Sequence, residues 1–114
     1  MAETKTFSCK SLTVGIALSY GGRAEIISAI QRIPQEHLAD ISEKDFSAML
    51  WTKDIPDPDL IIRTSGEERL SNFLPWQSAY SELFFTKTLW PDFTREEFKR
   101  ILDEYANRQR RFGA

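Results

Sequence analysis

The stretch DLIIRTSGEERLS, residues 59–71, runs from a short apolar segment into a turn that carries two arginines and several hydroxyl groups. The apolar residues 60–62 are partly β-branched and stop at Arg63, a pattern typical of a buried strand in a parallel sheet. Arg69 and Ser71 follow just ahead of a predicted helix. Guanidinium groups match phosphate oxygens in geometry and in charge. The stretch therefore indicates an anion site, and a diphosphate would suit it.

The turn at residues 64–66 strengthens this interpretation, because Thr64, Ser65 and Gly66 can offer hydroxyl and backbone donors. Spacing alone leaves an alternative open. The same residues would also form a capped loop whose arginines pair with Glu67, Glu68 or a nearby aspartate.

The chain before this stretch reads as the start of a βα unit. Residues 12–18 are apolar on both faces, which predicts a buried strand. Residues 19–22 form a glycine turn. Isoleucines at 26, 27, 30 and 33 then recur at helical spacing, and Pro34 ends the helix.

The rest of the chain alternates in the same way. A short helix is predicted at 42–50 with Ser42 as its cap, and a proline-rich loop at 54–59. A helix is expected from 71 or 72 to about 80, then a strand at 82–86. Thr94 and Glu97 have capping-box spacing before an amphipathic helix with apolar residues at 98, 101, 102 and 105. We predict an α/β fold: one domain over residues 1–114 with an open, mainly parallel sheet and flanking helices.

Two further groups of residues lie where strands are expected to begin or end. Gly21 and Gly22 allow the backbone to turn close to a ligand, and Arg23 opens a helix, whose free N–H groups favour anions. A structural turn with a solvated arginine is the alternative. Glu82, among apolar neighbours, needs a partner, either an arginine or a divalent cation.

Composition excludes several classes of protein. Fifteen basic and seventeen acidic side chains give a formal charge of -2, which argues against a general nucleic-acid binder. The single cysteine, Cys9, rules out an internal disulfide. No apolar run approaches the roughly 20 residues of a membrane helix, and the first residues lack a signal-peptide core. We predict a cytoplasmic protein and leave contact with a membrane surface open.

The segments SYGGRAEI, DLIIRTSGEERLSNFLPWQSAYSELFF, LWPDF and ANRQRRFG, in this order, resemble the C-terminal half of the cis-prenyltransferases. Undecaprenyl diphosphate synthase is the bacterial type of this family. The resemblance runs from about residue 12 to residue 113. It implies a transferase that condenses isopentenyl diphosphate onto an allylic diphosphate such as farnesyl diphosphate, forming cis double bonds with the help of Mg²⁺.

The resemblance also implies roles for individual residues. Arg63, Arg69 and Ser71, with Leu70 between them, look like the catalytic ligands of the isopentenyl diphosphate group. Glu82 resembles the metal-associated glutamate. The remaining matches are substrate-binding positions: Gly21, Gly22 and Arg23 in the Tyr-Gly-Gly-Arg turn, and Arg111 and Gly113 in a C-terminal Arg-x-Gly motif that completes the active site across a homodimer.

Three departures from the family pattern matter. Ser19 stands where the family usually has asparagine, and Pro75 stands where many members have an aliphatic residue. The Asp-Gly-Asn-Gly-Arg loop, whose aspartate binds Mg²⁺ and the allylic diphosphate in the family, does not occur. We therefore expect an N-terminally truncated domain that is inactive alone. The alternative is a non-catalytic partner subunit that supplies the Arg-x-Gly tail to a complete synthase.

Overall fold

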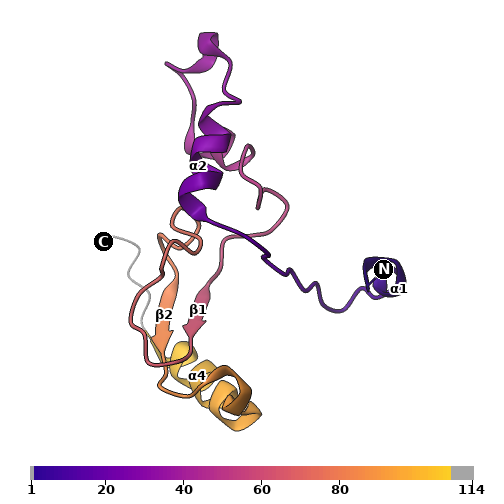
Figure 1. The fold of residues 1–114 in the computed structure, drawn as a ribbon, viewed down its shortest axis with the longest axis vertical. Coiled ribbons are helices and arrows are strands. Elements are labelled where there is room, and N and C mark those ends of the chain that lie inside the picture. Colours follow the sequence, from indigo (N-terminus) through magenta and orange to yellow (C-terminus); the bar gives the residue numbers. More distant parts are fainter. Residues whose placement is uncertain (1, 109–114) are drawn as a thin grey trace.

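The computed structural model describes residues 2–108 and has an α/β fold, as the sequence predicts. Strands β1 (Leu60–Arg63) and β2 (Glu82–Phe85) pair in parallel, with Leu60 opposite Glu82 and Arg63 opposite Phe85 (Figure 1). Both strands therefore end at the same edge of the sheet. Both were predicted from their short apolar runs.

The helices are α1 (Ala2–Thr6), α2 (Gly22–Ile30), α3 (Glu43–Ser47) and α4 (Arg95–Asn107), with 3₁₀ turns η1 (Gln35–His37) and η2 (Trp90–Asp92). The predicted caps are present. Ser42 and Asp45 form a complete capping box at α3, and the Thr94 hydroxyl accepts the Glu97 N–H (3.1 Å) at α4. The α4 box is only half formed, because the Glu97 carboxylate accepts hydrogen bonds from the hydroxyls of Thr86 (2.5 Å) and Thr88 (3.1 Å) instead.

Three of the buried apolar side chains lie where α4 meets the two strands (Figure 1). Ile61 of β1, Phe84 of β2 and Ile101 of α4 are buried. Of the apolar face that the spacing of the last helix predicts, only Ile101 is buried, and Phe98 and Leu102 are 42% and 39% exposed. Within the part of the chain that the structure describes, no helix combines the length and the apolar character that crossing a bilayer requires.

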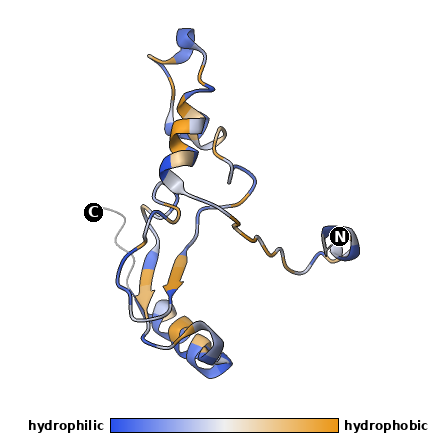
Figure 2. Ribbon diagram, in the orientation of Figure 1, coloured by the Kyte–Doolittle hydropathy of each residue, from blue (hydrophilic) through white to orange (hydrophobic). Residues whose placement is uncertain are grey.

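The prediction of a buried strand at residues 12–18 is wrong for this chain. The segment is extended but irregular, and it is largely apolar (Figure 2). Its side chains at Leu12, Val14, Ile16 and Leu18 are 73–83% exposed. The physical reason is that a strand needs a neighbour. No backbone hydrogen bond ties residues 10–20 to any other segment between residues 2 and 108.

The prediction of a helix from residue 71 or 72 to about 80 is also wrong. Residues 71–80 form a series of turns. Ser71, Asn72 and Leu74 have positive φ angles of 49°, 68° and 50°. L-residues in the left-handed region cannot continue a right-handed helix, so the segment stays irregular.

Candidate functional site

The loop after β1 folds back so that Arg63, the last residue of the strand, reaches Ser71. The Arg63 Nη1 group donates to the Ser71 hydroxyl oxygen (2.9 Å) and to the Arg69 carbonyl oxygen (2.5 Å). The guanidinium group therefore fixes the far end of the loop. Two of the side chains that the sequence predicts to act together lie within hydrogen-bonding distance.

Arg69 takes a different direction. Its guanidinium group forms an ion pair with Glu67, on an exposed part of the loop. The capped-loop alternative predicts this pairing, whereas the Arg63–Ser71 contact fits both interpretations, because it orders the loop and also brings two predicted ligands together. Leu70, which lies between Arg69 and Ser71 in the sequence, is half-buried. Its carbonyl oxygen accepts the Phe73 N–H (3.0 Å).

One expectation about the turn at 64–66 is wrong. The backbone N–H groups of Ser65 and Gly66 donate to the carbonyl oxygens of Thr88 (2.9 Å) and Thr86 (2.8 Å). These donors extend the pairing of β1 with β2 and are already used. These two backbone donors are therefore not available to an anion.

Asn72 joins the loop to the glycine turn, and sequence reasoning missed it as a site residue. Its carbonyl oxygen accepts the Gly22 N–H (2.9 Å), and its side-chain Oδ1 accepts the Arg23 N–H (2.8 Å). Asn72 thus caps the start of α2 from a distant part of the chain. Asparagine following a polar turn is a signal for such capping, because its side chain tolerates the left-handed backbone and accepts hydrogen bonds.

This cap corrects a second expectation. The N–H groups of Gly22 and Arg23, the first two of α2, are not free to bind an anion, because both already donate hydrogen bonds to Asn72. Arg23 itself is exposed, directly beside Asn72. Through the adjacent residues Ser71 and Asn72, the structure brings the Arg63 loop and the Tyr-Gly-Gly-Arg turn together.

Close packing requires glycine at position 22 and leaves little room for a side chain at position 21. A Cβ atom on Gly22 would lie 2.0 Å from the Cδ atom of Pro75, and one on Gly21 would lie 3.1 Å from the Asn72 Nδ2 atom. The segment after Ser71 therefore packs directly on the glycine backbone. Pro75 departs from the family pattern, yet it forms this contact.

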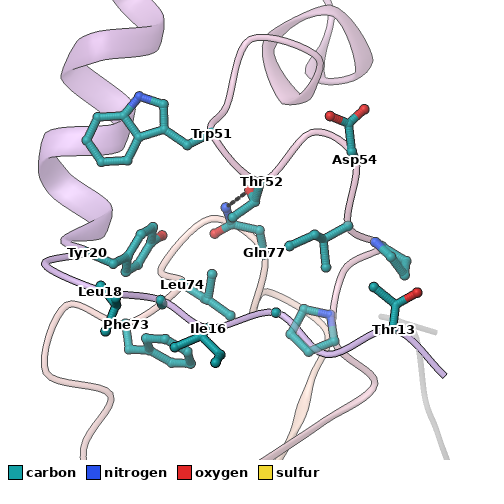
Figure 3. A pocket seen from close by; sticks show the side chains of 15 residues that line it. Thr13, Ile16, Leu18, Tyr20, Trp51, Thr52, Asp54, Phe73, Leu74 and Gln77 are labelled. Atoms are coloured by element: carbon teal, nitrogen blue, oxygen red, sulfur yellow. Dashed lines mark hydrogen bonds between the residues drawn. The ribbon is translucent and has the colours of Figure 1, made fainter. Parts of the chain in front are cut away.

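A buried carboxylate supports the junction from the side of α2. Glu25 is fully buried. It accepts hydrogen bonds from the Tyr20 hydroxyl (2.5 Å), the Gln77 amide (3.0 Å), and the backbone N–H and hydroxyl of Thr52 (3.1 Å each). The Gln77 amide also donates to the Thr52 hydroxyl oxygen (2.6 Å; Figure 3). Glu25 therefore ties together the glycine turn, the 51–58 loop and the segment after Asn72.

The network sets the ionisation of its members. Burial acts to raise the pKa of Glu25, but the hydrogen bonds from Tyr20, Gln77 and Thr52 outweigh it and hold the pKa below its ordinary value of 4.5. Burial and the hydrogen bond to the Glu25 carboxylate raise the pKa of the Tyr20 hydroxyl. Glu25 is thus an ionised acceptor and Tyr20 a neutral donor at neutral pH.

We expect a Glu25→Gln variant to lose about 2–3 kcal/mol of unfolding free energy at pH 7, because an amide cannot accept all of these hydrogen bonds. A carboxyl whose pKa is depressed in the folded state stabilises above its unfolded pKa and loses that contribution as pH falls through the folded value. The difference between wild type and variant should therefore shrink below about pH 4.5. Urea unfolding from pH 7 to pH 3 measures it. A constant difference across this range would contradict the assignment.

Glu82, the predicted metal-associated residue, has an arginine partner. Its carboxylate accepts from Arg108 (2.7 Å), and the Arg108 guanidinium lies 3.8 Å from the centre of the Phe84 ring. Across residues 2–108, no group of three or more His, Cys, Asp or Glu side chains is arranged to hold a metal ion. The described residues alone therefore do not form a metal site. Arg108 is the arginine partner that the structural alternative for Glu82 predicts. Arg111 and Gly113, the predicted Arg-x-Gly motif, lie outside the described residues.

Comparison with known proteins gives a consistent result. The prenyltransferase family model for undecaprenyl diphosphate synthase matches residues 1–113. The chain is 52% identical over 115 residues to an isoprenyl transferase of Thermotoga maritima, an alignment that covers 97% of this chain and 49% of the relative. It is 51% identical over 118 residues to the farnesyl-diphosphate-specific ditrans,polycis-undecaprenyl-diphosphate synthase of Micrococcus luteus, covering 98% of this chain and 47% of that protein.

A solved structure that resembles this chain comes from the same family as these relatives. The crystal structure of a probable undecaprenyl diphosphate synthase from Campylobacter jejuni matches with a TM-score of 0.84 and 44% identity, covering 98% of this chain and 52% of that one. The chain spans about half the length of the curated relatives it matches.

Proposed function

The chain belongs to the undecaprenyl diphosphate synthase family of prenyltransferases, and we propose that it is the part of such an enzyme that binds the diphosphate group of isopentenyl diphosphate. A generic phosphate-binding module would use the same arginines and hydroxyl groups, but it lacks this family support.

The observation that carries the proposal is the hydrogen bond between Arg63 and Ser71 (2.9 Å) at the end of a parallel strand. In open α/β sheets, ligands bind beyond the carboxyl ends of the strands. Arg63 presents a cation at this edge and Ser71 a hydroxyl. Arg69 joins them when its guanidinium exchanges Glu67 for a phosphate oxygen. An exposed ion pair is weak enough to permit this exchange.

We assign to these residues the binding and orientation of the nucleophilic substrate. In the condensation, the carbon–oxygen bond of the allylic diphosphate breaks and diphosphate leaves. The isopentenyl double bond attacks the allylic carbon, and a proton is lost as the new double bond forms. Holding the isopentenyl diphosphate in line removes the entropic cost of bringing the two substrates together. The arginines also offset the charge of the bound diphosphate.

We include Mg²⁺ in the proposal because the family that this chain resembles uses it. Mg²⁺ is commonly held by one or two carboxylates together with substrate phosphates, and it supplies charge neutralisation there. Glu82 would supply one carboxylate, provided that it leaves its contact with Arg108. Further ligands would come from the diphosphates and from the part of the domain that this chain does not cover.

The allylic substrate, farnesyl diphosphate or a related compound, is also assigned to that other part. Arg111 and Gly113 would contribute to the active site of a homodimer as an Arg-x-Gly motif. A cytoplasmic location, with contact to a membrane through the lipid product, stays a prediction.

The proposal is tested by incubating the chain with isopentenyl diphosphate, farnesyl diphosphate and Mg²⁺. We expect no prenyl product from the chain alone, while a full-length relative such as the Thermotoga maritima enzyme supplies the positive control. Product formed by the chain alone would contradict the division of roles.

The partner-subunit alternative makes a different prediction. If the chain serves only to supply its tail, an Arg111→Ala change should lower the activity of a complex with a complete synthase, and an Arg63→Ala change should not. The presence of all four predicted site residues disfavours this alternative, because a subunit without chemistry of its own has no evident need for Arg63, Arg69, Ser71 and Glu82.

A further inference from the structure

Ser71 and Asn72 form the centre of a tight turn with an unusual backbone conformation. The Leu70 carbonyl oxygen accepts the Phe73 N–H (3.0 Å) and closes the turn. Ser71 and Asn72 have φ angles of 49° and 68°, as in a type I′ turn, where glycine, asparagine and aspartate are the usual residues. Asparagine therefore suits its position, whereas serine is unfavourable. An unfavourable conformation held at a ligand position indicates a use for the side chain there.

The Ser71 hydroxyl is the group that this backbone conformation presents. Its oxygen accepts a hydrogen bond from the Arg63 guanidinium group (2.9 Å). A hydroxyl has one proton to donate besides the lone pairs with which it accepts, so this bond leaves the Ser71 proton for an anion oxygen. Hydrogen bonds in a chain strengthen one another, and donation from Arg63 makes the hydroxyl a better donor. This arrangement lasts only while Ser71 stays beside Arg63.

Asn72 holds the other side of Ser71. Its carbonyl oxygen accepts the Gly22 N–H (2.9 Å), and its Oδ1 atom accepts the Arg23 N–H (2.8 Å). The N-cap residue of α2 is Gly21, which has no side chain to cap the helix. Asn72 therefore takes the place of the capping side chain. Its backbone cannot leave the left-handed region without moving the Oδ1 atom away from the helix.

The helix to which Asn72 is anchored is itself held in place. Glu25, in the first turn of α2, is fully buried. Its carboxylate accepts hydrogen bonds from Tyr20, Thr52 and Gln77. Ligand residues on a loop are positioned precisely when the loop is fastened to a rigid element of this kind.

We propose that Asn72 is a positioning residue for the diphosphate site. Its side chain transfers the fixed position of the α2 N-terminus to Ser71 and so keeps the Ser71 hydroxyl beside the Arg63 guanidinium group. Asn72 acts through Ser71 and not by contact with the substrate. This inference rests on the proposed function, because it concerns the same isopentenyl diphosphate site.

Removing the cap should weaken isopentenyl diphosphate binding, because apparent affinity falls with the fraction of chains whose loop is in the binding conformation. Asn72→Gly keeps the left-handed backbone and loses only the cap. We expect about threefold weaker binding, within the range of about 2- to 12-fold that one hydrogen bond covers. Asn72→Ala also strains the backbone, so we expect about tenfold weaker binding. Isothermal titration calorimetry with the 114-residue chain measures both affinities.

A second helix cap in the same chain provides the matched control. Ser42 caps α3 through its hydrogen bonds with Asp45, so Ser42→Ala removes a cap of the same kind from another helix. Urea denaturation should show that Ser42→Ala is at least as destabilising as Asn72→Gly, since loss of a cap residue destabilises a helix. Its affinity for isopentenyl diphosphate should nevertheless stay within about twofold of the parent chain.

The Arg63 guanidinium group reports the position of Ser71 without any substrate. Its nitrogen-15 side-chain NMR signals, identified by their absence from the Arg63→Lys variant, should shift in Asn72→Ala. They should stay in place in Ser42→Ala. They should also stay in place in Asn72→Asp, because aspartate keeps the acceptor and tolerates the left-handed backbone.

Two kinds of result would contradict the inference, and they are distinguishable. The inference alone fails if Asn72→Ala binds within about twofold of the parent chain, or if Asn72→Ala and Ser42→Ala lose equal affinity. Unchanged Arg63 signals in Asn72→Ala have the same consequence. A parent chain that does not bind isopentenyl diphosphate would overturn the proposed function and this inference together.

Discussion

An Arg63→Ala variant should bind isopentenyl diphosphate at least tenfold more weakly than the parent chain. A hydrogen bond to a charged group contributes about 1.5–3 kcal/mol, which corresponds to roughly a 10- to 150-fold change in affinity. The loss should fall at the upper end of this range. Arg63 also holds the loop closed through the Ser71 hydroxyl and the Arg69 carbonyl, so its removal releases two other predicted ligands. Isothermal titration calorimetry measures the affinities.

Arg100→Ala is the matched control. It removes the same charge, but Arg100 lies on α4, where its ion pairs with Glu97 and Glu104 are long (3.9 and 3.7 Å). Its affinity should stay within about twofold of the parent chain, since exposed pairs of this kind contribute little. The affinity of an Arg63→Lys variant for isopentenyl diphosphate should lie between those of Arg63→Ala and Arg100→Ala, because lysine keeps the charge and loses the forked geometry. Equal losses in Arg63→Ala and Arg100→Ala would show that only net charge matters.

A Gly22→Ala variant should be the most destabilising single methyl addition in the glycine turn. The new Cβ would lie 2.0 Å from Pro75 Cδ and 2.4 Å from its Cγ, and the rigid ring cannot rotate away. Overpacking of this kind costs about 1–3 kcal/mol. The gain from replacing glycine at a compatible position, about 0.4–1 kcal/mol, is smaller. We expect a net loss of about 1–2 kcal/mol in the free energy of unfolding, measured by urea denaturation.

Gly15→Ala separates the clash from the general effect of replacing glycine. A Cβ there would meet the Ile55 Cδ1 atom at 3.5 Å, an ordinary contact, so stability should be unchanged or slightly higher. Gly22→Ala should also weaken isopentenyl diphosphate binding, because it pushes Pro75 and the neighbouring Asn72 away from α2. A Gly22→Ala protein as stable as the parent would refute the packing of the glycine turn on the 71–77 segment.

Local sequence patterns predict the elements whose hydrogen-bond partners lie nearby or within this chain. The caps at Ser42 and Thr94 bond only to the next turn of their own helix, and β1 pairs with β2 of the same chain. Residues 12–18 carry an equally clear strand pattern, yet a strand forms only with a neighbour, which no local signal supplies. The helix predicted after Ser71 does not form, and the reason is different. Asn72 adopts a left-handed backbone and caps α2, a long-range contact that periodicity does not report.

One contact of the candidate site joins residues of a single short stretch. Arg63 and Ser71, which the sequence groups as ligands of one anion, lie 2.9 Å apart, and their role in binding stays a prediction. The roles of Arg69 and Glu82 stay predictions, since their present partners are Glu67 and Arg108. Ser19 has a positive φ of 54°, a conformation that asparagine adopts more readily than serine. This gives a physical reason for the asparagine that the family usually has there. Glu25 and Gln77 could not be found from sequence, because their importance depends on burial.

The central claim is that the loop between Arg63 and Ser71 recognises a diphosphate. Phosphorus-31 NMR of isopentenyl diphosphate, titrated with the chain in the absence of any allylic substrate, tests it most directly. We predict a saturable shift of both phosphorus signals, at least tenfold weaker affinity for isopentenyl monophosphate, and loss of the shift in the Arg63→Ala variant. Unshifted signals, or equal binding of monophosphate and diphosphate, would contradict it.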